Sequence, residues 1–383
     1  MSISLETSHS QILKWFQLEF PELTKSMNEC THHFDEEHVN PYHLEGTIWA
    51  HSMLVYKNSE IFSPNRHHVK WSALLHDIGK PLACERVEDR KRVRFIGHEG
   101  ISAFMAIDIL NKTDMSTEDK LYIFKLVSLH GSLFNFLKSD GTIKADLINK
   151  FEGNAQLLED LTHQVRCDSF GRWVDTDLVD DHDPLFTQML PDHFEETIAS
   201  LGEDVYRGDK PHQLTILVGP PCSDKSTEIK KLLLDDPTTV VISRDALVES
   251  VGLKYGQTNY SDSWKWLKMK EHEKIEKEEV DAELMKIVQT ARREKLSVII
   301  DQTNMSKKSR RKWINQFEKD YNKKCITFLK GYEQQLLCNK ERENREGKRI
   351  SKWVTLNMLK GFALPMYGEG FDTIEYKWIP ERF

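Results

Sequence analysis

The segment LTILVGPPCSDKST, residues 214–227, passes from a short apolar run into a loop that begins with glycine. Residues 228–234 continue with helix-forming side chains, so the order is strand, loop and helix. This order is typical of a phosphate-binding loop, in which backbone N–H groups and the start of the helix surround a polyphosphate. Lys225 would then contact the terminal phosphates, and Ser226 would bind Mg²⁺. The residues predicted to hold the nucleotide here are Gly219, Ser223, Lys225, Ser226 and Thr227.

Two positions of this loop depart from the usual pattern. Asp224 stands immediately before the lysine, where the motif has glycine, and Cys222 stands where a second glycine is common. An aspartate adds a side chain and a negative charge beside the bound phosphate, and both effects weaken nucleotide binding. Two alternatives follow for this half of the chain: a working nucleotide-binding domain, or a loop that no longer binds nucleotide.

The second half of the chain alternates short apolar runs with longer helical segments. The runs are residues 214–218, 239–243, 297–300 and 325–329. Short buried strands separated by helices indicate a parallel α/β sheet. Asp245 follows the second run, and Asp301 and Asn304 follow the third, so we expect them at the carboxyl ends of strands, where such sheets bind ligands. A charged segment that contains Arg345 and Arg349 suits a lid.

These residues resemble the kinase domain of the polynucleotide 5′-kinases, which heal nucleic-acid ends. The resemblance covers roughly residues 212–380 and includes Arg244-Asp245, the sequence Asp-Gln-Thr-Asn at 301–304, and two arginines four residues apart. It implies that Asp245 takes the proton of a 5′-hydroxyl and that Arg349 stabilises the transferring phosphoryl group.

The same resemblance implies ATP or another nucleoside triphosphate with Mg²⁺, bound by Lys225 together with the lid pair Arg345 and Arg349. Residues implied to hold the substrate are Arg244, Asp301 and Asn304. Val248 departs from the phage members of the family, which carry an arginine there for the neighbouring phosphate of the strand. Phosphoryl transfer is therefore more strongly indicated than a polynucleotide acceptor.

In the first half, the segment ALLHDIGK at residues 73–80 places His76 and Asp77 at the end of an apolar helical run. His51 lies in an upstream helical stretch, and Asp168 lies in a downstream segment. Histidines and carboxylates brought together from three helices would form a mixed nitrogen and oxygen ligand set. Such a set suits a divalent transition metal with open positions for water and phosphate.

This pattern resembles the HD phosphohydrolase superfamily over roughly residues 35–175. The resemblance implies a catalytic metal site made by His51, His76, Asp77 and Asp168. His98 and His130 fall where two-metal members carry their extra ligands, so a second ion is implied; the alternative is two ordinary histidines near a single metal. Lys80 and His43 are implied as contacts of the substrate's phosphate. Five further histidines are expected to be ordinary solvated or capping residues: His32, His33, His67, His68 and His163.

Composition limits the remaining possibilities. The chain has 383 residues, 30% charged and 39% hydrophobic, which is a globular composition with room for two domains. Its formal net charge of −8 argues against coating nucleic acid through bulk electrostatics. Six scattered cysteines indicate neither a disulfide framework nor a thiolate zinc site. No apolar run has the length of a membrane span and the N-terminus lacks signal-peptide character, so we expect a cytoplasmic protein.

We therefore predict two domains. Residues 1–180 should form an all-α HD-type phosphohydrolase, and residues 212–383 an α/β P-loop kinase with a parallel sheet and a helical lid. Residues 181–211 are predicted to be a linker or a docking helix, because apolar residues such as Phe186 and Phe194 lie there among prolines and acidic residues.

The two predicted activities match the two ends of a broken RNA. RNA cut by transesterification ends in a 2′,3′-cyclic phosphate and a 5′-hydroxyl, and ligation needs the first hydrolysed and the second phosphorylated. We expect an end-healing enzyme for RNA or DNA ends, with a ligase as a candidate partner and no particular oligomeric state. The alternatives are a nucleotide-metabolising enzyme with a small acceptor, and an HD hydrolase whose silent P-loop domain only grips nucleic acid.

Overall fold

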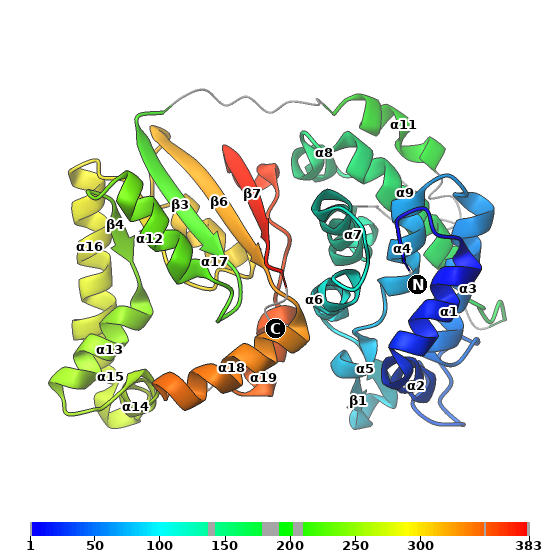
Figure 1. Ribbon diagram of the computed structural model, residues 1–383, viewed down its shortest axis with the longest axis horizontal. Coiled ribbons are helices and arrows are strands. Elements are labelled where there is room, and N and C mark those ends of the chain that lie inside the picture. The colour runs from blue at the N-terminus through cyan, green and yellow to red at the C-terminus, as the bar shows by residue number, and fades with distance from the viewer. Residues whose placement is uncertain (1, 137–141, 178–190, 202–209, 348–349, 381–383) are drawn as a thin grey trace. The chain divides into compact units, whose positions relative to one another are not determined.

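The computed structural model describes residues 2–136, 142–177, 191–201, 210–347 and 350–380. The chain divides into two compact units (Figure 1). The first consists of Met1–Val205 with Leu359–Leu364, and the second of Tyr206–Met358 with Pro365–Phe383. The first unit is built almost wholly of helices and the second of helices around a parallel sheet, so the predicted fold class is confirmed.

Capping residues define the starts of several helices in the first unit. The Thr47 hydroxyl accepts a hydrogen bond from the Ala50 N–H, and Ser116 accepts one from Asp119 in the same way. The helices are α1 (His9–Glu19), α2 (Pro21–Glu29), α3 (Ile48–Phe62), α4 (His67–Leu75), α5 (Lys80–Ala83), α6 (His98–Leu110), α7 (Thr117–Leu129), α8 (Asp146–Phe151), α9 (Ala155–Phe170) and α11 (Pro191–Ala199). A short antiparallel hairpin, β1 (Glu85–Val87) with β2 (Arg92–Arg94), is an addition to the predicted all-α domain.

Helix α4 forms the centre of the first unit. Its residues Val69–Leu75 are all buried, as expected for a helix that is covered on every side. It packs against α3, α7 and α9. The chain leaves its end through Gly79, where a Cβ would lie 2.5 Å from the backbone nitrogen of Ser102 in α6, so the close approach requires glycine. His76 and Asp77, which precede Gly79, are thereby enclosed by helices.

The second unit contains a five-stranded parallel sheet of order β4-β5-β3-β6-β7. Its strands are β3 (His212–Val218), β4 (Val240–Ile242), β5 (Val298–Ile300), β6 (Tyr321–Leu329) and β7 (Thr373–Trp378). The strand that comes first in the chain, β3, lies in the middle and pairs with both β5 and β6. The loops that follow β3, β4 and β5 therefore meet at one edge of the sheet.

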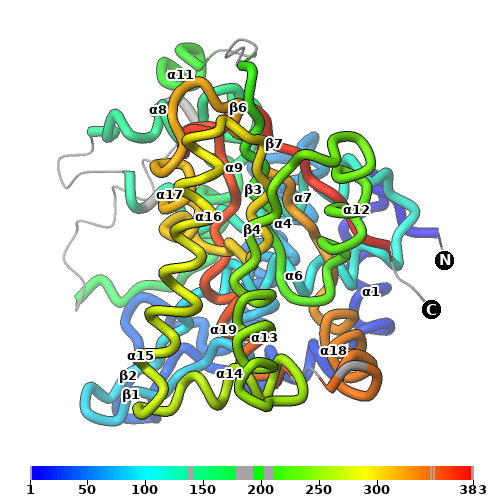
Figure 2. Tube along the Cα trace, turned by 90° about the vertical axis from the view of Figure 1, so that its left-hand side faces the viewer, coloured from blue at the N-terminus to red at the C-terminus, as the bar shows by residue number. Residues whose placement is uncertain are grey.

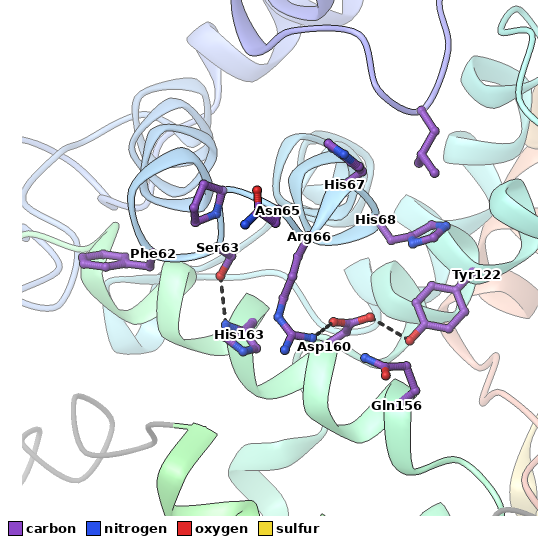
Figure 3. Close-up of a pocket in the computed structure, with 12 residues that line it drawn as sticks. Phe62, Ser63, Asn65, Arg66, His67, His68, Tyr122, Gln156, Asp160 and His163 are labelled. Carbon is purple, nitrogen blue, oxygen red and sulfur yellow. Dashed lines mark hydrogen bonds and ion pairs between the residues drawn. The ribbon is translucent and has the colours of Figure 1, made fainter.

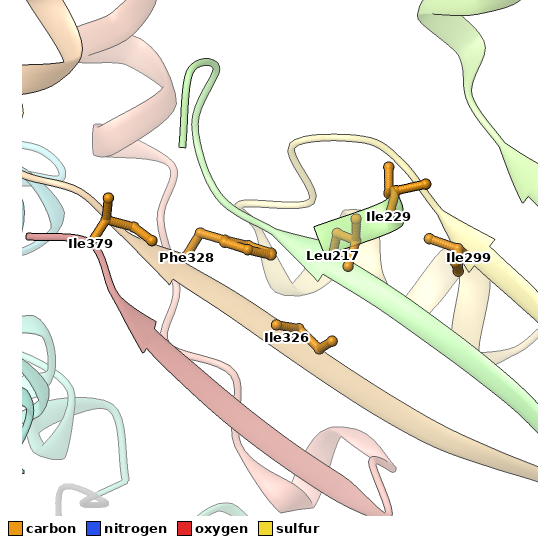
Figure 4. Packing of buried hydrophobic residues seen from close by; sticks show 6 residues of the cluster. All are labelled: Leu217, Ile229, Ile299, Ile326, Phe328 and Ile379. Atoms are coloured by element: carbon orange, nitrogen blue, oxygen red, sulfur yellow. The ribbon is translucent and has the colours of Figure 1, made fainter. Parts of the chain in front are cut away.

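Helices cover both faces of this sheet, with α12 on one side and α16 and α17 on the other (Figure 2). The helices are α12 (Lys225–Asp235), α13 (Arg244–Lys254), α14 (Tyr260–Leu267), α15 (Glu273–Ile275), α16 (Ala282–Arg293), α17 (Lys307–Ile314), α18 (Tyr332–Glu346) and α19 (Lys352–Lys360). Ile229 of α12 packs in a buried cluster with Leu217, Ile299, Ile326 and Phe328 of the sheet (Figure 4). Burying one such side chain contributes about 1.5–3 kcal/mol, so the cluster fixes the start of α12 against β3.

Helix α11 lies within the predicted linker, residues 181–211. It packs against α9, and its Phe194 is fully buried. Phe186 lies outside the described residues. Across the described ranges, no helix combines the length and the apolar character needed to cross a bilayer.

Candidate active sites

The side chain of Asp77 lies at the centre of a buried histidine cluster in the first unit. Its Oδ2 atom is 3.2 Å from Nε2 of His76 and 3.6 Å from Nε2 of His51. Its Oδ1 atom is 3.2 Å from Nε2 of His98 and 3.8 Å from Nε2 of His130. Asp77 therefore presents one oxygen to each of two histidine pairs, and each pair with Asp77 is spaced so that it could hold a metal ion.

Three of these imidazoles are held in the same way. Nδ1 of His76, His98 and His130 lies 2.9, 2.7 and 2.7 Å from the carbonyl oxygen of the residue three positions earlier. A carbonyl can only accept, so each Nδ1 carries the proton and each Nε2 keeps a lone pair directed into the cluster. Nε2 of His98 and Nε2 of His130 are 3.0 Å apart. Two lone pairs at that distance repel each other unless a cation lies beside both.

The donor atoms of the cluster fit a divalent metal. The buried Nε2 of His76 and both carboxylate oxygens of Asp77 have no well-formed hydrogen bond in the part of the chain that the structure describes. Burial acts to raise the pKa of Asp77, but its contacts with the His76 ring and with the ammonium group of Lys80, whose Nζ is 2.7 Å from Oδ2, hold it well below its usual range. An ionised carboxylate with neutral imidazoles is the ligand set that first-row transition metals favour.

His51 links the cluster to two further carboxylates. Its Nε2 is 3.0 Å from Oδ1 of Asp168, the predicted ligand on α9. Its Nδ1 is 3.0 Å from Oε1 of Glu45, and His43 donates its Nδ1–H to the same oxygen at 2.7 Å. Burial lowers the pKa of His51, but Asp168 and Glu45 outweigh burial and raise it to about 9. A carboxylate behind a ligand histidine fixes its ring and proton, so Glu45 is a candidate functional residue that the sequence patterns did not identify.

Lys80 and His43, the predicted phosphate contacts, lie beside the cluster together with His32. Nζ of Lys80 is 3.2 Å from Nε2 of His32, and the rings of His32 and His43 are stacked with their centroids 3.8 Å apart. His32 is only 3% exposed, so the expectation of an ordinary solvated or capping histidine is wrong. Burial, reinforced by the charge of Lys80, places the pKa of His32 far below its usual value and lowers that of His43 to about 4.

A separate pocket of about 700 Å³ opens in the first unit and is lined by the loop between α3 and α4, by α7 and by α9 (Figure 3). Tyr122 donates to Asp160 at 2.8 Å, Arg66 also pairs with Asp160, and Ser63 lies 2.9 Å from Nδ1 of His163. The polar side chains of the pocket thus pair with one another. None of the predicted catalytic residues lines it, so the cluster around Asp77 is the candidate active site of this unit.

The phosphate loop of the second unit connects β3 to α12. A Cβ on Gly219 would lie 2.7 Å from Oγ of Ser223, so the tight turn requires glycine. Nζ of Lys225 donates to the carbonyl oxygens of Gly219 at 2.8 Å and Pro220 at 2.6 Å. The ammonium group is therefore held inside the loop. Thr227, in the first turn of α12, is exposed, as is its neighbour Ser226.

Cys222 and Asp224, the two departures from the motif, both have left-handed backbone conformations. Their φ angles are 61° and 66°, a region that glycine adopts freely and other residues adopt at a cost. Asp224 is the residue that precedes α12. The backbone at both positions is thus one that glycine would favour, although neither residue is glycine.

The charges of two predicted carboxylates act on Lys225. Burial lowers the pKa of the Lys225 ammonium to about 8, and the negative charges of Asp301 and Asp245 oppose this shift. Both carboxylates follow strands, Asp245 after β4 and Asp301 after β5. The loop lysine and the two acidic residues are therefore brought together at the carboxyl edge of the sheet, as the sequence predicts.

Helix α18 also carries Arg342, which the sequence predicts to be a charge on the helix face rather than a ligand. The positive charge of Arg342 acts on the pKa of Lys225 and on that of Asp301. Arg345, the predicted ligand, is exposed one turn further along α18, and Arg349 lies outside the described residues. Residues three apart on a helix share a face, so the position of Arg342 relative to Arg345 was the signal that could have identified it.

Two of the predicted substrate contacts have partners within the protein. Arg244 pairs with two carboxylates of the π-helical turn Glu276–Asp281, at 2.6 and 3.1 Å. Asn304 is 2% exposed, and its side-chain amide donates to the carbonyl oxygen of Leu217 at 2.9 Å. Asn304 thus ties the loop after β5 to β3, which supports a positioning role for its side chain.

Two family models match the chain in separate regions. Residues 48–150 match the model of the HD domain, and residues 214–365 match the model of an AAA domain. The chain joins an HD domain to a P-loop kinase-like domain. The first region contains the predicted metal ligands other than Asp168, and the second contains the phosphate loop, Asp245 and Asp301.

A comparison with curated proteins finds no match. Among solved structures, the chain is similar to one of a Pnkp1/Rnl/Hen1 RNA repair complex, with 21% identity and a TM-score of 0.32 over 40% of this chain and 45% of that one. It is also similar to a candidate kinase from Chloroflexus aurantiacus J-10-fl, with 13% identity and a TM-score of 0.31 over 45% of this chain and 87% of that one. The chain thus spans less than half the length of the first structure, and we assign no activity from either likeness.

Proposed function

We propose that the chain is an end-healing enzyme for nucleic acid, with RNA as the expected substrate. The kinase-like unit would phosphorylate a 5′-hydroxyl, and the HD unit would hydrolyse a 2′,3′-cyclic or terminal phosphate. One observation supports this most strongly: a single chain pairs a buried histidine–aspartate cluster suited to divalent metals with a phosphate loop and two carboxylates that follow neighbouring strands of the same sheet. Both kinds of ends left by transesterifying cleavage would then be made ready for a ligase.

In the HD unit, one ion would be held by His51, His76, Asp77 and Asp168, and a second by Asp77 with His98 and His130. When bound, such ions supply Lewis acidity that activates water and neutralises phosphate oxygens. The hydrogen bonds from Nδ1 to backbone carbonyls keep the Nε2 atoms of three ligands unprotonated and aimed inward. Lys80 would orient the phosphate, since its ammonium group lies next to Asp77.

In the kinase-like unit, Asp245 would accept the proton of the 5′-hydroxyl as its oxygen bonds to the γ-phosphorus of ATP. The bond from that phosphorus to ADP would break in the same step. Lys225 would hold the phosphate oxygens, Ser226 would bind Mg²⁺, and Arg345 with Arg349 would close over the nucleotide. The place of Asp245, in the first turn of α13 beside the loop that carries Asp301, supports the role of a general base.

One observation favours a second candidate for the kinase-like unit. Val248, where the resemblance calls for an arginine that contacts the strand, is 1% exposed and packs in a core with Val251, Leu267 and Val280. The position therefore offers no contact to a neighbouring phosphate. A small acceptor, such as a free nucleoside or nucleotide, would not need that contact.

An RNA that carries both a 5′-hydroxyl and a 2′,3′-cyclic phosphate separates the candidates. It would be incubated with ATP, Mg²⁺ and one of Mn²⁺, Ni²⁺ or Co²⁺, with both ends analysed, beside mononucleotides with the same ends. We expect the 5′ end to gain a phosphate and the cyclic phosphate to open. Reaction of the mononucleotides alone would favour nucleotide metabolism, and an unchanged 5′ end with no ATP binding would identify a silent loop.

A further inference from the structure

The stacked histidines beside the HD cluster have a hydrogen-bonding group that no other described residue uses. The rings of His32 and His43 are nearly parallel, at 9°, with centroids 3.8 Å apart. Lys80 joins this pair to the cluster, because its Nζ lies 3.2 Å from Nε2 of His32 and 2.7 Å from Oδ2 of Asp77. The pair is thus one side chain away from the predicted metal ligands.

The contact with Lys80 fixes the proton on His32. An ammonium group has no lone pair and can only donate, so Nε2 of His32 accepts and the ring proton is on Nδ1. Nδ1 is buried and has no hydrogen-bond partner in the described ranges. A buried N–H without an acceptor is costly, and native proteins rarely keep one. The Nδ1–H of His32 therefore lacks an acceptor among the described residues and is suited to donate to a bound ligand.

A third metal ion is a poor candidate for this position, although His32, His43 and Glu45 offer atoms spaced within 4.8 Å of one another. An ion bound by imidazole lies in the plane of the ring, at about 2.0–2.1 Å from nitrogen. An ion between two parallel rings would lie out of each plane by about half of their separation. Moreover, Oε1 of Glu45 already faces Nδ1 of His43 at 2.7 Å and Nδ1 of His51 at 3.0 Å.

An oxyanion satisfies the same groups. Lys80 has three N–H bonds. One is directed at Nε2 of His32, and the ammonium group also forms an ion pair with Oδ2 of Asp77 at 2.7 Å, so another N–H is available for an oxygen that also accepts from Nδ1 of His32. His43 donates its own Nδ1–H to Glu45, so it holds the ring of His32 by stacking. We propose that His32 and Lys80, braced by His43, form a subsite for a non-bridging oxygen of the phosphoryl group that the HD unit hydrolyses. This inference rests on the proposed hydrolase activity of that unit.

Two amide substitutions of His32 distinguish the ring nitrogens. In His32→Asn the amide nitrogen takes the place of Nδ1, whereas in His32→Gln the amide lies at the place of Nε2, where its oxygen can accept from Lys80, and no donor remains at Nδ1. Inorganic phosphate is the probe, titrated calorimetrically into the metal-loaded full chain and used as an inhibitor of bis-p-nitrophenyl phosphate hydrolysis. We expect His32→Gln to weaken phosphate binding about 10- to 100-fold, and His32→Asn by less than about threefold. The metal content should stay at the wild-type value in both variants.

Other outcomes would overturn the subsite. The loss of one ion per chain in His32→Gln would identify a third metal site. Unchanged phosphate binding would indicate that the Nδ1–H of His32 donates to a water molecule instead of to phosphate. Equal weakening by both variants would assign His32 to packing alone. Far-ultraviolet circular dichroism and thermal unfolding report whether the first unit, which contains His32, is folded in each variant. A measurement on the wild type needs no variant: with ¹⁵N-labelled histidine, the Nδ1 resonance of His32 should shift as phosphate saturates, and a fixed resonance would refute the proposal.

The same experiment separates this inference from the proposed function. Inorganic phosphate and the model ester require no RNA. If the wild type healed no RNA end but bound phosphate with the predicted pattern, the end-healing proposal would fail and the subsite would stand.

Discussion

The phenolic hydroxyl of Tyr260 donates a hydrogen bond to Asp245, with 3.0 Å between Oη and Oδ1. Tyr260 is the first residue of α14 and Asp245 lies in the first turn of α13, so the contact joins the starts of two helices. Burial and then the charge of Asp245 raise the pKa of Tyr260, so its hydroxyl remains protonated and acts as the donor. The proposed general base is thereby held in one orientation beside the phosphate loop.

Substitution of Asp245 by alanine should abolish phosphoryl transfer while ATP binding is retained. A general base contacts the proton of the acceptor and not the nucleotide, and its loss typically costs about 10²- to 10⁴-fold in rate. Tyr260→Phe removes only the hydrogen bond that orients the Asp245 carboxylate, so the rate of phosphoryl transfer should fall by about tenfold. Single-turnover phosphorylation and ATP titration measure the two quantities. Glu249→Gln, one turn further along α13, is the matched control, and a rate in Asp245→Ala equal to that of the control would refute the assignment.

Removal of Asp77 should empty both predicted metal positions, because each of its oxygens faces a different histidine pair. Removal of His130, which lies only on the Oδ1 side, should leave one ion per chain. Elemental analysis of the desalted Asp77→Asn and His130→Ala proteins gives the stoichiometry. Hydrolysis should be lost in Asp77→Asn, and phosphorylation should persist because it belongs to the other unit. Wild-type protein with a single ion, unaffected by His130→Ala, would contradict the second position.

The affinity for ATP should fall as the pH rises through about 8. Burial lowers the pKa of Lys225 to about 8 in the free protein, so this ammonium group loses its charge above that pH, whereas polyphosphate binds the charged form. Binding must then take up a proton, about half a proton per ATP at pH 8. Calorimetry in buffers of different ionisation enthalpy measures the uptake. Lys225→Arg stays charged and should show none, and a wild type without uptake would place the lysine outside the phosphate site.

The pair Arg310–Glu369 should dominate the stability of the loop that carries Asp301. Arg310 is fully buried, it donates to both carboxylate oxygens of Glu369 at 2.8 and 2.6 Å, and it donates to the carbonyl of Asn304 at 3.1 Å. Glu369→Gln leaves a buried charge unpaired, so the free energy of unfolding of the second unit should fall by about 3–5 kcal/mol. Urea denaturation measures it.

The exposed pair of Lys277 with Glu273 provides the control for that measurement. Its removal by Lys277→Met should cost less than about 1 kcal/mol, since an exposed ion pair is screened by solvent. Equal effects of the two substitutions would show that the Arg310 pair is not the element that holds the loop.

The sequence predicted those features that depend on local order along the chain. The runs that became β3, β4, β5 and β6 are short, apolar and separated by helices, so the parallel sheet and the carboxyl-edge positions of Asp245 and Asp301 followed from pattern alone. In the observed strand order, β3 pairs with both β5 and β6. The loops that follow β3 and β5 therefore lie next to each other at the carboxyl edge of the sheet.

The features that the sequence did not predict come from contacts between distant segments. His32 meets Lys80 across 48 residues, and Glu45 meets the backbone of Trp173 across 128, so no spacing rule links them. The hairpin of β1 and β2 is built from Glu85-Arg86-Val87 and Arg92-Val93-Arg94, whose charges give no apolar alternation. Such contacts depend on how helices and loops pack, and only the three-dimensional structure contains that information.

The charge of Asp224 and its backbone conformation can be tested separately. With φ at 66°, its backbone is in the left-handed region, which costs an ordinary residue about 1–2 kcal/mol and costs glycine little. Asp224→Gly removes both the side chain and the charge. Asp224→Asn removes the charge but keeps a residue that tolerates this conformation, and Asp224→Ala removes the charge while it keeps the strain.

We expect the glycine variant to bind ATP most tightly, with each tenfold gain equal to about 1.4 kcal/mol. If the charge beside the polyphosphate is the handicap, the asparagine variant should gain nearly as much as glycine, and salt should reduce the difference from wild type. If strain is the handicap, asparagine should resemble the wild type, alanine should bind more weakly than either, and glycine alone should also raise the unfolding free energy of the second unit. ATP affinity and 5′-phosphorylation measured on all four proteins decide between these causes. Equal values throughout would show that the loop has adapted to Asp224, so that neither its charge nor its backbone conformation limits the kinase.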